Sequence, residues 1–227
     1  MIKIFIQEFM LNNCNFNSFL EIFLNKNNKI SSDSESITNL SFDDNFLQGT
    51  YLKKIIQKEP TNNPFIEENY IEFEYFVNQQ FYLIKNNSRF FLVIINPTKY
   101  TKLFYAYLDD LSGLNLILKD KHININHMIK KNLSDTKYRI IRAKFCAVTL
   151  SETSKATIEI SSSINAVNDF IKTFGDIYYE ISKAKFIIYN ENNNDLDLDI
   201  SKTGLIQIAK FNLINEINIL KIINIIF

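Results

Sequence analysis

The chain has 227 residues, enough for one large domain or two small ones, and 46% of them are hydrophobic, enough to build a core. Its 25 basic residues balance its 25 acidic residues, so a nucleic-acid or anionic-lipid partner would need a local basic patch. The four glycines are far apart in sequence, which excludes phosphate-binding loops, the dinucleotide fingerprint and the nucleophile elbow, because each needs closely spaced glycines.

The composition also bears on source and compartment. Counts of 37 Ile and 30 Asn against 3 Arg and no Trp indicate codon pressure from an AT-rich genome, so Asn-rich stretches carry little structural signal. Two cysteines do not make a disulfide framework, and no run of about 18 uncharged apolar residues predicts a membrane helix. The first residues are charged at Lys3 and Glu8, unlike a secretory signal. We therefore expect a cytoplasmic protein with no membrane partner.

The first sixty residues predict one strand and two helices. Alternating isoleucines favour a strand over residues 1–9, and helical spacing of Phe and Leu favours a helix over 16–24. A second helix, capped by Asp43 or Asp44, is predicted from four apolar residues at helical spacing. These residues are Leu47, Leu52, Ile55 and Ile56.

The middle of the chain predicts a β-hairpin and then a helix. Residues 66–96 alternate as strands do, and the polar residues 86–88 form a short turn between two of these strands. The run FLVII, at 91–95, is apolar on both faces and is typical of a central strand. A helix capped by Thr98 and stopped by Gly113 follows.

The remaining elements are shorter. A strand is predicted over 114–120 and a helix over 127–133. Two strands, 137–150 and 156–161, flank the turn SETS, and a helix capped by Ser163 ends at Gly175. Further strands are predicted in IYYEI, KFIIY, LDLDI and LIQIAKF.

Many short strands mixed with about five helices predict an α+β fold with a mixed, mostly antiparallel sheet. Two stretches share the order strand, strand, helix, strand, with a Gly after each helix, so two similar halves are an architectural hypothesis. No Pro-rich or Gly-rich linker interrupts the chain. We expect a single domain over 1–227, and a subdivision near 60–65 is the alternative.

Three aspartates alternate with apolar residues in the run DLDLD. Asp195, Asp197 and Asp199 would lie on one face of a strand, where carboxylates could hold a hard cation. The Gly and the distal Glu of a calcium loop are missing, however. We interpret the run as an edge strand whose charges deter pairing with other sheets.

A basic segment between Lys119 and Lys144 contains eight basic and two acidic residues, including two of the three arginines. Arginine suits phosphate contacts. In a regular strand, residues 137 and 139 would face one side and residues 142 and 144 the other, and a bulge at 140–141 would bring them together. This segment is either a solvated face or an anion-binding or nucleic-acid surface. The candidate contact residues are Lys130, Lys131, Lys137, Arg139, Arg142 and Lys144.

The same segment holds the only arrangement that resembles a metal-dependent nuclease. Asp135 and Lys137 match a triplet of an acid, any residue and a lysine, and Asp120 is the candidate second acid. Two carboxylates would bind Mg²⁺ while the lysine steadied the phosphate or the attacking water. Under any other function we expect no metal and no cofactor.

Histidine and cysteine chemistry is expected to be absent. His122 and His127 are five residues apart, a spacing that suits a metal site on neither a helix nor a strand. Cys146 lies in the apolar run FCAV, so we interpret it as a buried, inert thiol.

The chain ends on NEINILKIINIIF, whose polar residues recur at every third position. They leave neither a helix nor a strand with one clean polar face, so burial is expected, either in the core or against a partner. Interface candidates are Ile222, Ile223, Ile225, Ile226 and Phe227.

The sequence favours a non-enzymatic interaction protein, a subunit of a cytosolic assembly that contacts another protein or a second copy of itself. A basic surface that contacts nucleic acid could accompany this role. The alternative is the Mg²⁺-dependent nuclease or phosphodiesterase with Asp120, Asp135 and Lys137 at its site.

Overall fold

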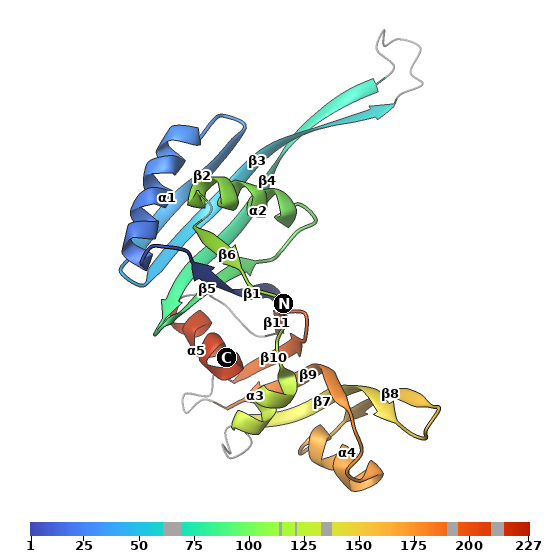
Figure 1. Cartoon of the computed structure of the whole chain (residues 1–227). Helices are drawn as coiled ribbons and strands as arrows, with labels where there is room; N and C mark the ends of the chain where they lie inside the picture. Colours follow the sequence, from blue (N-terminus) through green and yellow to red (C-terminus); the bar gives the residue numbers. More distant parts are fainter. Residues whose placement is uncertain (61–69, 114, 121, 133–137, 190–194, 210–215) are drawn as a thin grey trace. The chain divides into compact units, whose positions relative to one another are not determined.

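The computed structural model describes residues 1–60, 70–113, 115–120, 122–132, 138–189, 195–209 and 216–227. Within these ranges the chain forms five helices and eleven strands (Figure 1). Strand pairs whose register is known are antiparallel. The predicted α+β fold with a mostly antiparallel sheet is confirmed.

The chain divides into two compact units. Unit 1 comprises residues 1–7 and 120–227, and unit 2 comprises residues 8–119. Strand β1 (Ile2–Leu11) contributes to both. The position suggested for a subdivision, residues 60–65, lies between two paired strands of unit 2. The expectation of one domain over the whole chain stays a prediction.

Unit 2 is a sheet covered by two helices. Its strand order is β2-β3-β4-β5-β1, and β6 pairs with Phe9 to Leu11 at the end of β1. Helices α1 and α2 contact each other. The elements after β1 are α1 (Phe16–Ile30), β2 (Glu35–Asp43), β3 (Phe46–Pro60), β4 (Tyr70–Asn86), β5 (Arg89–Ile95), α2 (Thr101–Ser112) and β6 (Leu116–Leu118).

Aromatic rings fill the space between this sheet and its helices. Phe9 of β1 packs on Phe19 of α1, with 6.3 Å between ring centres, and Phe81 of β4 packs on Phe104 of α2 at 4.7 Å. Tyr51 of β3 also contacts Phe104, at 5.4 Å. All five side chains are buried, and burial of each apolar side chain contributes about 1.5–3 kcal/mol. This core fixes β3 and β4 against α2.

Glu8 ties three strands of unit 2 together. Its carboxylate accepts hydrogen bonds from Arg89 at the start of β5 and from Lys119 just after β6, each at 2.6 Å. Burial by itself would raise the pKa of Glu8, but the hydrogen bonds and charges of the two cations outweigh it. The pKa therefore lies below its ordinary value.

The second predicted helix is wrong, because residues 46–60 form strand β3 and residues 35–43 form a strand that the sequence did not predict. β3 lies between β2 and β4 and pairs with both. Pairing on both edges outweighs the helical spacing of its apolar residues. Asp43 caps a turn instead of a helix, since its side chain accepts the backbone N–H of Asn45 at 2.8 Å.

The other predictions in unit 2 are confirmed in type, with small shifts at the ends. β4 and β5 form the expected hairpin, and Asn87 adopts the left-handed conformation (φ 55°) in its turn. Residues 91–95 are buried, as expected for a central strand. Gly113 ends α2 in the left-handed conformation (φ 60°). Helix α2 begins at Thr101 and has no side-chain cap, so the predicted Thr98 cap is wrong.

The strands of unit 1 follow the order β1-β11-β10-β9-β7-β8 in the eleven-stranded sheet. Helix α3 contacts β9, and α4 contacts β7 and β8. Phe145 of β7 stacks on Phe170 of α4, with 4.0 Å between ring centres, and both rings are buried. The elements are α3 (Ile125–Asn132), β7 (Tyr138–Thr149), β8 (Lys155–Ser161), α4 (Ala166–Phe174), β9 (Glu180–Ile188), β10 (Leu196–Ser201), β11 (Leu205–Ile208) and α5 (Glu216–Ile226).

The run DLDLD is not an edge strand. It forms most of β10, which pairs with β9 on one side and β11 on the other. Asp197 binds Lys185 at 2.9 Å and Asp199 binds Lys183 at 2.8 Å, while the intervening leucines are buried. The aspartates therefore form cross-strand ion pairs within the sheet and do not protect an edge.

The repeated order of elements is present. β4, β5, α2 and β6 run strand, strand, helix, strand, as do β7, β8, α4 and β9, and each helix ends at a glycine. The pairing differs between the two sets, however. β6 pairs with β1, whereas β9 pairs with β7, the first strand of its own set. The two halves are similar in element order and different in topology.

Gly49 has no room for a methyl group. A Cβ there would lie 2.9 Å from the Phe81 ring and 3.0 Å from Ile37 Cγ2. We expect Gly49→Ala to lower the free energy of unfolding by about 1–3 kcal/mol, because the overpacked Phe81 must shift against Phe104. Chemical denaturation measures this. Ser41→Ala, at an exposed position on the neighbouring β2, should change it by less than about 0.5 kcal/mol. Equal effects of the two substitutions would contradict the clash.

The ion pairs of Glu8 predict a pH-dependent contribution to stability. Glu8→Gln should lower the free energy of unfolding near neutral pH by about 1 kcal/mol, since both cationic partners are partly exposed. Because the folded-state pKa is depressed, the difference from the wild type should shrink as the pH falls below about 5 and vanish once the carboxyl is protonated. Urea titrations over this range test it, with Glu152→Gln, on the exposed β7–β8 turn, as control. A difference that does not depend on pH would contradict the assignment.

Candidate functional site

The most distinctive surface of unit 2 is a two-stranded ribbon formed by the far ends of β3 and β4. Pairing between the two strands continues without interruption from Phe46 and Ile84 to Pro60 and Tyr70. β2 pairs with β3 only as far as Lys53. Beyond that point the two strands extend alone, toward the upper right of Figure 1. We call residues 54–60 and 70–76 the β-arm.

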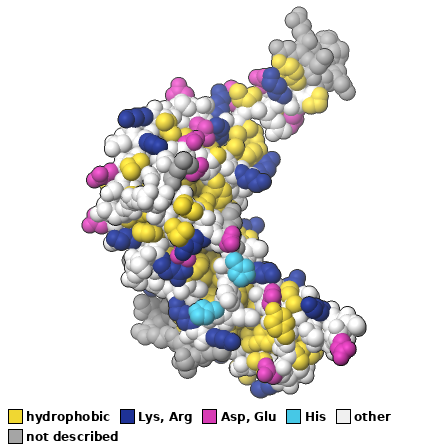
Figure 2. All heavy atoms as spheres, viewed as in Figure 1, with side chains coloured by type: hydrophobic (Ala, Val, Ile, Leu, Met, Phe, Trp, Pro, Cys, Tyr) yellow, Lys and Arg dark blue, Asp and Glu magenta, His cyan; other side chains and the backbone are white. Residues whose placement is uncertain are grey.

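The β-arm exposes large apolar side chains. Phe76 is 61% exposed, Ile56 53%, Phe73 47% and Ile71 38%. Hydrophobic side chains stand among charged ones on the ribbon in Figure 2. An isolated two-stranded ribbon is only marginally stable in water, and exposed apolar patches of this kind mark interaction sites. The arm is therefore a candidate contact surface.

Side chains alternate between the two faces of the β-arm. The face that carries Ile56 also carries two ion pairs, Lys54 with Glu74 at 2.7 Å and Lys58 with Glu72 at 2.6 Å. The opposite face is more apolar, with Ile55, Phe73 and Ile71 near one another, and it is anchored at its base. There the hydroxyl groups of Tyr75 and Tyr100 form a hydrogen bond.

The sequence analysis missed the arm because it assigned residues 46–60 to a helix. A usable signal was present, however. The stretch IEFEYFV alternates apolar and charged residues, and its strand partner KKIIQKEP offers two lysines to its glutamates. What the sequence could not show was that β2 stops short and leaves both strands uncovered.

The second candidate surface lies on β7 in unit 1, where a bulge is present. Ile140 pairs with Phe186 and Arg142 pairs with Lys185, so Ile141 has no partner residue in β9. The extra residue reverses the alternation of side chains from Arg142 to Phe145. A bulge at residues 140–141 was the condition for a single basic surface on β7, and the structure contains this bulge.

The bulge places three candidate residues together. Arg139, Arg142 and Lys144 are exposed, whereas Ile140 and Ala143 are buried on the opposite face. On the neighbouring β9, Lys183 and Lys185 pair with Lys144 and Arg142. We call this surface the basic face. Its residues are Arg139, Arg142, Lys144, Lys183 and Lys185.

Acidic partners neutralise only part of the basic face. Lys183 and Lys185 bind the aspartates of β10, and Arg142 Nε lies 3.6 Å from Glu159 on β8. The Arg139 guanidinium lies over the ring of Tyr189, at 5.5 Å. Lys144 is exposed. Among the described residues, three of these five cations form ion pairs with carboxylates, so the surface is only partly neutralised.

The other basic candidates lie elsewhere. Lys130 and Lys131 are in α3, which contributes Met128 and Ile129 to the apolar side of the sheet, opposite the basic face. Lys131 Nζ donates to the backbone carbonyl of Asn224 at 3.3 Å. Lys119 belongs to the Glu8 cluster of unit 2. Lys137 lies outside the described residues. In the described part of unit 1 the basic residues do not form one patch, because α3 packs on the side of the sheet opposite Arg139.

The nuclease hypothesis stays a prediction. Asp120, the first residue of the segment 120–227 of unit 1, has an exposed side chain. Asp135 and Lys137 lie outside the described residues. Within the ranges that the structure describes, no cluster of three or more His, Cys, Asp or Glu residues could hold a metal ion. Both histidines are exposed, and Figure 2 shows them at the surface. Cys146 is half-buried, and its thiol donates to Ser182 Oγ at 3.1 Å.

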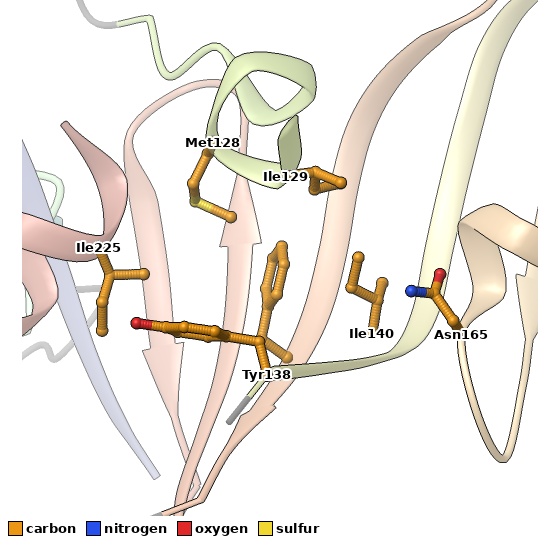
Figure 3. A pocket seen from close by; sticks show the side chains of 7 residues that line it. Met128, Ile129, Tyr138, Ile140, Asn165 and Ile225 are labelled. Carbon is orange, nitrogen blue, oxygen red and sulfur yellow. The ribbon is translucent and has the colours of Figure 1, made fainter. Parts of the chain in front are cut away.

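A cavity in unit 1 is too small for a metabolite. It holds about 30 Å³, roughly the volume of one water molecule. Figure 3 shows Met128 and Ile129 of α3 above it, the Tyr138 ring below it with the hydroxyl toward Ile225, and the Asn165 amide toward Ile140. The cavity is a packing gap among apolar side chains and offers no ligand site.

The C-terminal residues form helix α5, which contacts α3. Ile222, Ile223 and Ile226 are buried, and Ile225 and Phe227 are half-buried. Burial of the tail is thus observed, as the sequence suggested. Its role as a contact surface stays a prediction, and the β-arm is the more accessible apolar surface.

Comparison with known proteins leaves the function to be argued from these surfaces. No protein-family model matches the chain, and no curated protein sequence matches it. Across the described residues, none of the helices has the length and apolar character needed to cross a membrane.

Proposed function

We propose that the protein is a non-enzymatic subunit of a cytoplasmic protein assembly and that it binds its partner through the β-arm. The observation that carries this proposal is the exposure of Ile56, Ile71, Phe73 and Phe76 on the arm, where β3 and β4 pair only with each other among the described strands. The arm buries little of its own apolar surface, so a partner that covers it would gain roughly 25 cal/mol for each Å² removed from water.

The arm is built to hold its shape before a partner binds. Cross-strand ion pairs and the Lys58 side chain over the Tyr70 ring, at 4.3 Å, order it along its length. At its base, Tyr51 of β3 packs on Phe104 in the core, and the Tyr75 hydroxyl forms a hydrogen bond with that of Tyr100. A preordered ribbon loses less conformational entropy on binding than a flexible loop does.

Substitution of the arm should abolish partner binding without unfolding the protein. We expect the variant Ile56→Thr, Phe73→Thr, Phe76→Thr to lose a stoichiometric partner that the wild type retains, because threonine keeps strand propensity but removes the apolar contact. The test is affinity purification of tagged chains from the native host, with subunit ratios measured by mass spectrometry.

The matched control is Phe42→Thr with Ile164→Thr, two exposed apolar residues away from the arm. This control should keep the partner. A wild type that purifies with no stoichiometric partner and does not self-associate would refute the proposed function. Retention of the partner by the arm variant would move the contact to another surface, such as α5.

A second candidate function is nucleic-acid binding, which the bulge in β7 favours. The basic face joins Arg139 and Arg142 to lysines of two strands, and arginine side chains on an open sheet suit phosphate contacts. The aspartates of β10 limit its strength. Binding would therefore be weak and salt-dependent.

Removal of the three β7 cations tests this second function. The variant Arg139→Ala, Arg142→Ala, Lys144→Ala should weaken binding to a single-stranded oligonucleotide. It should also reduce the slope of log affinity against log salt by about 0.7 for each phosphate that the protein no longer neutralises. Fluorescence anisotropy over a salt series measures both effects. Lys130→Ala with Lys131→Ala on α3 is the control and should leave them unchanged. Absent or salt-independent binding would remove this candidate.

A further inference from the structure

Strand β6 presents a free edge. The backbone N–H of Lys119 donates to the carbonyl of Glu8, and that of Asn12 donates to the carbonyl of Asn115. Ile117 of β6 and the flanking residues 115 and 119 therefore direct their backbone groups toward β1. Leu116 and Leu118 direct theirs away from it. Among the described strands, β6 pairs only with β1.

An apolar groove runs beside this edge, between β6 and α2. Its volume is about 350 Å³. Leu108 and Tyr105 of α2 and Leu116 and Leu118 of β6 line it, while Ile117 is 46% exposed. Asp109, in the last turn of α2, places an exposed carboxylate at the groove. An edge strand beside a groove of this kind can accept an extended strand, whose alternate side chains enter the groove.

The β-arm supplies a strand with the matching pattern. The backbone N–H of Lys54 donates to the carbonyl of Ser34, on the side of β3 where β2 lies. By the same alternation, Ile56 and Lys58 direct their backbone groups to that side, beyond the end of β2. The free edge of β3 thus offers two outward-facing residues, two positions apart, as β6 does.

We propose that the β3 edge of the β-arm of one molecule adds as a strand to the β6 edge of a second copy of this chain. An antiparallel register with Ile56 opposite Leu118 puts Lys58 opposite Leu116, and each pair exchanges two backbone hydrogen bonds. Directly opposed residues share a face, so the Ile56 side chain enters the groove. Lys58 then lies toward the end of α2 that carries Asp109.

Charge favours the β3 edge over the other edge of the arm. β3 presents Ile56 and Lys58 at the contact, whereas the outward positions of β4 are Tyr70, Glu72, Glu74 and Phe76, and Asp109 would repel the two glutamates. The donor and the acceptor are different surfaces of one unit. The contact is therefore heterologous, and an assembly keeps one unused arm at one end and one unused groove at the other unless a ring closes.

This inference rests on the proposed function and specifies the partner as a second copy. Sedimentation and light scattering on the purified wild type should show a mass that rises with concentration. Two variants remove one edge each, Ile56→Pro on the arm and Leu118→Pro on the groove. In both, the N–H that proline removes points away from the existing sheet, so the fold is kept. Each should weaken self-association about tenfold or more.

The decisive measurement mixes the two variants. The arm variant keeps a working groove and the groove variant keeps a working arm, so together they should form a 1:1 heterodimer and nothing larger. Ile71→Thr, on the opposite face of the arm, is the matched control and should assemble as the wild type does. Circular dichroism verifies folding, and Asp109→Lys, at an exposed position, is a second groove variant that should also weaken assembly.

Three outcomes would overturn the inference. These are a wild type that stays monomeric at all concentrations, an oligomer unaffected by either proline variant, and an arm variant that fails to pair with the groove variant while the latter still dimerises alone. The last outcome would indicate arm-to-arm contact. If a different protein binds through the arm while the purified chain stays monomeric, the proposed function stands and the second-copy inference falls.

Discussion

The continuous pairing of β3 with β4 is the constraint on which unit 2 depends. Fifteen residue pairs form one ladder, and only its first half is held by neighbours. There, the absence of a side chain at Gly49 lets the Phe81 ring approach the strand, and Phe81 and Tyr51 pack on Phe104. A ladder anchored at one end transmits its register to the other end, because a slip by one residue would exchange buried and exposed faces. The β-arm therefore keeps a defined edge with no sheet beneath it.

In unit 1 the decisive feature is a break in the register between β7 and β9, whereas in unit 2 it is the uninterrupted pairing of β3 with β4. A single extra residue, Ile141, reverses the alternation over residues 142–145, so that Ala143 and Phe145 face the helices while Arg142 and Lys144 face outward. The lysines of β9 meet the aspartates of β10 on that outward face. The charges stabilise a sheet face that no helix covers, and the cations left over give it a positive character. The bulge at Ile141 therefore contributes both to core packing and to the charge of the outer surface.

The sequence predicted the fold class and most elements, because these depend on local pattern, whereas it gave the bulge in β7 only as the condition for one basic surface. It failed where pairing decided the structure. Leu52, Ile55 and Ile56 fit a helix by spacing, yet pairing with β4 holds all three in a strand, and β2 also pairs with Leu52. The aspartates of β10 were assigned to an edge because sequence cannot show that two strands flank them. The candidate site was missed for the same reason, since exposure of the arm depends on where β2 ends.

Exposed strand edges usually carry features that prevent indiscriminate pairing, and the two edges of unit 2 carry them unequally. On the arm, lysine, glutamate and proline occupy residues 58–60, so uncontrolled stacking of arms is opposed. On β6, the edge is only three residues long, too short for amyloid-like growth but long enough for two hydrogen-bonded pairs. These features oppose pairing of one arm with another arm and of one β6 with another β6. Apolar contacts and opposite charges still favour pairing of an arm with β6. The charges and the proline of the arm and the short length of β6 oppose other pairings, so assembly is limited to one type of contact. A subunit that must not aggregate needs this limit.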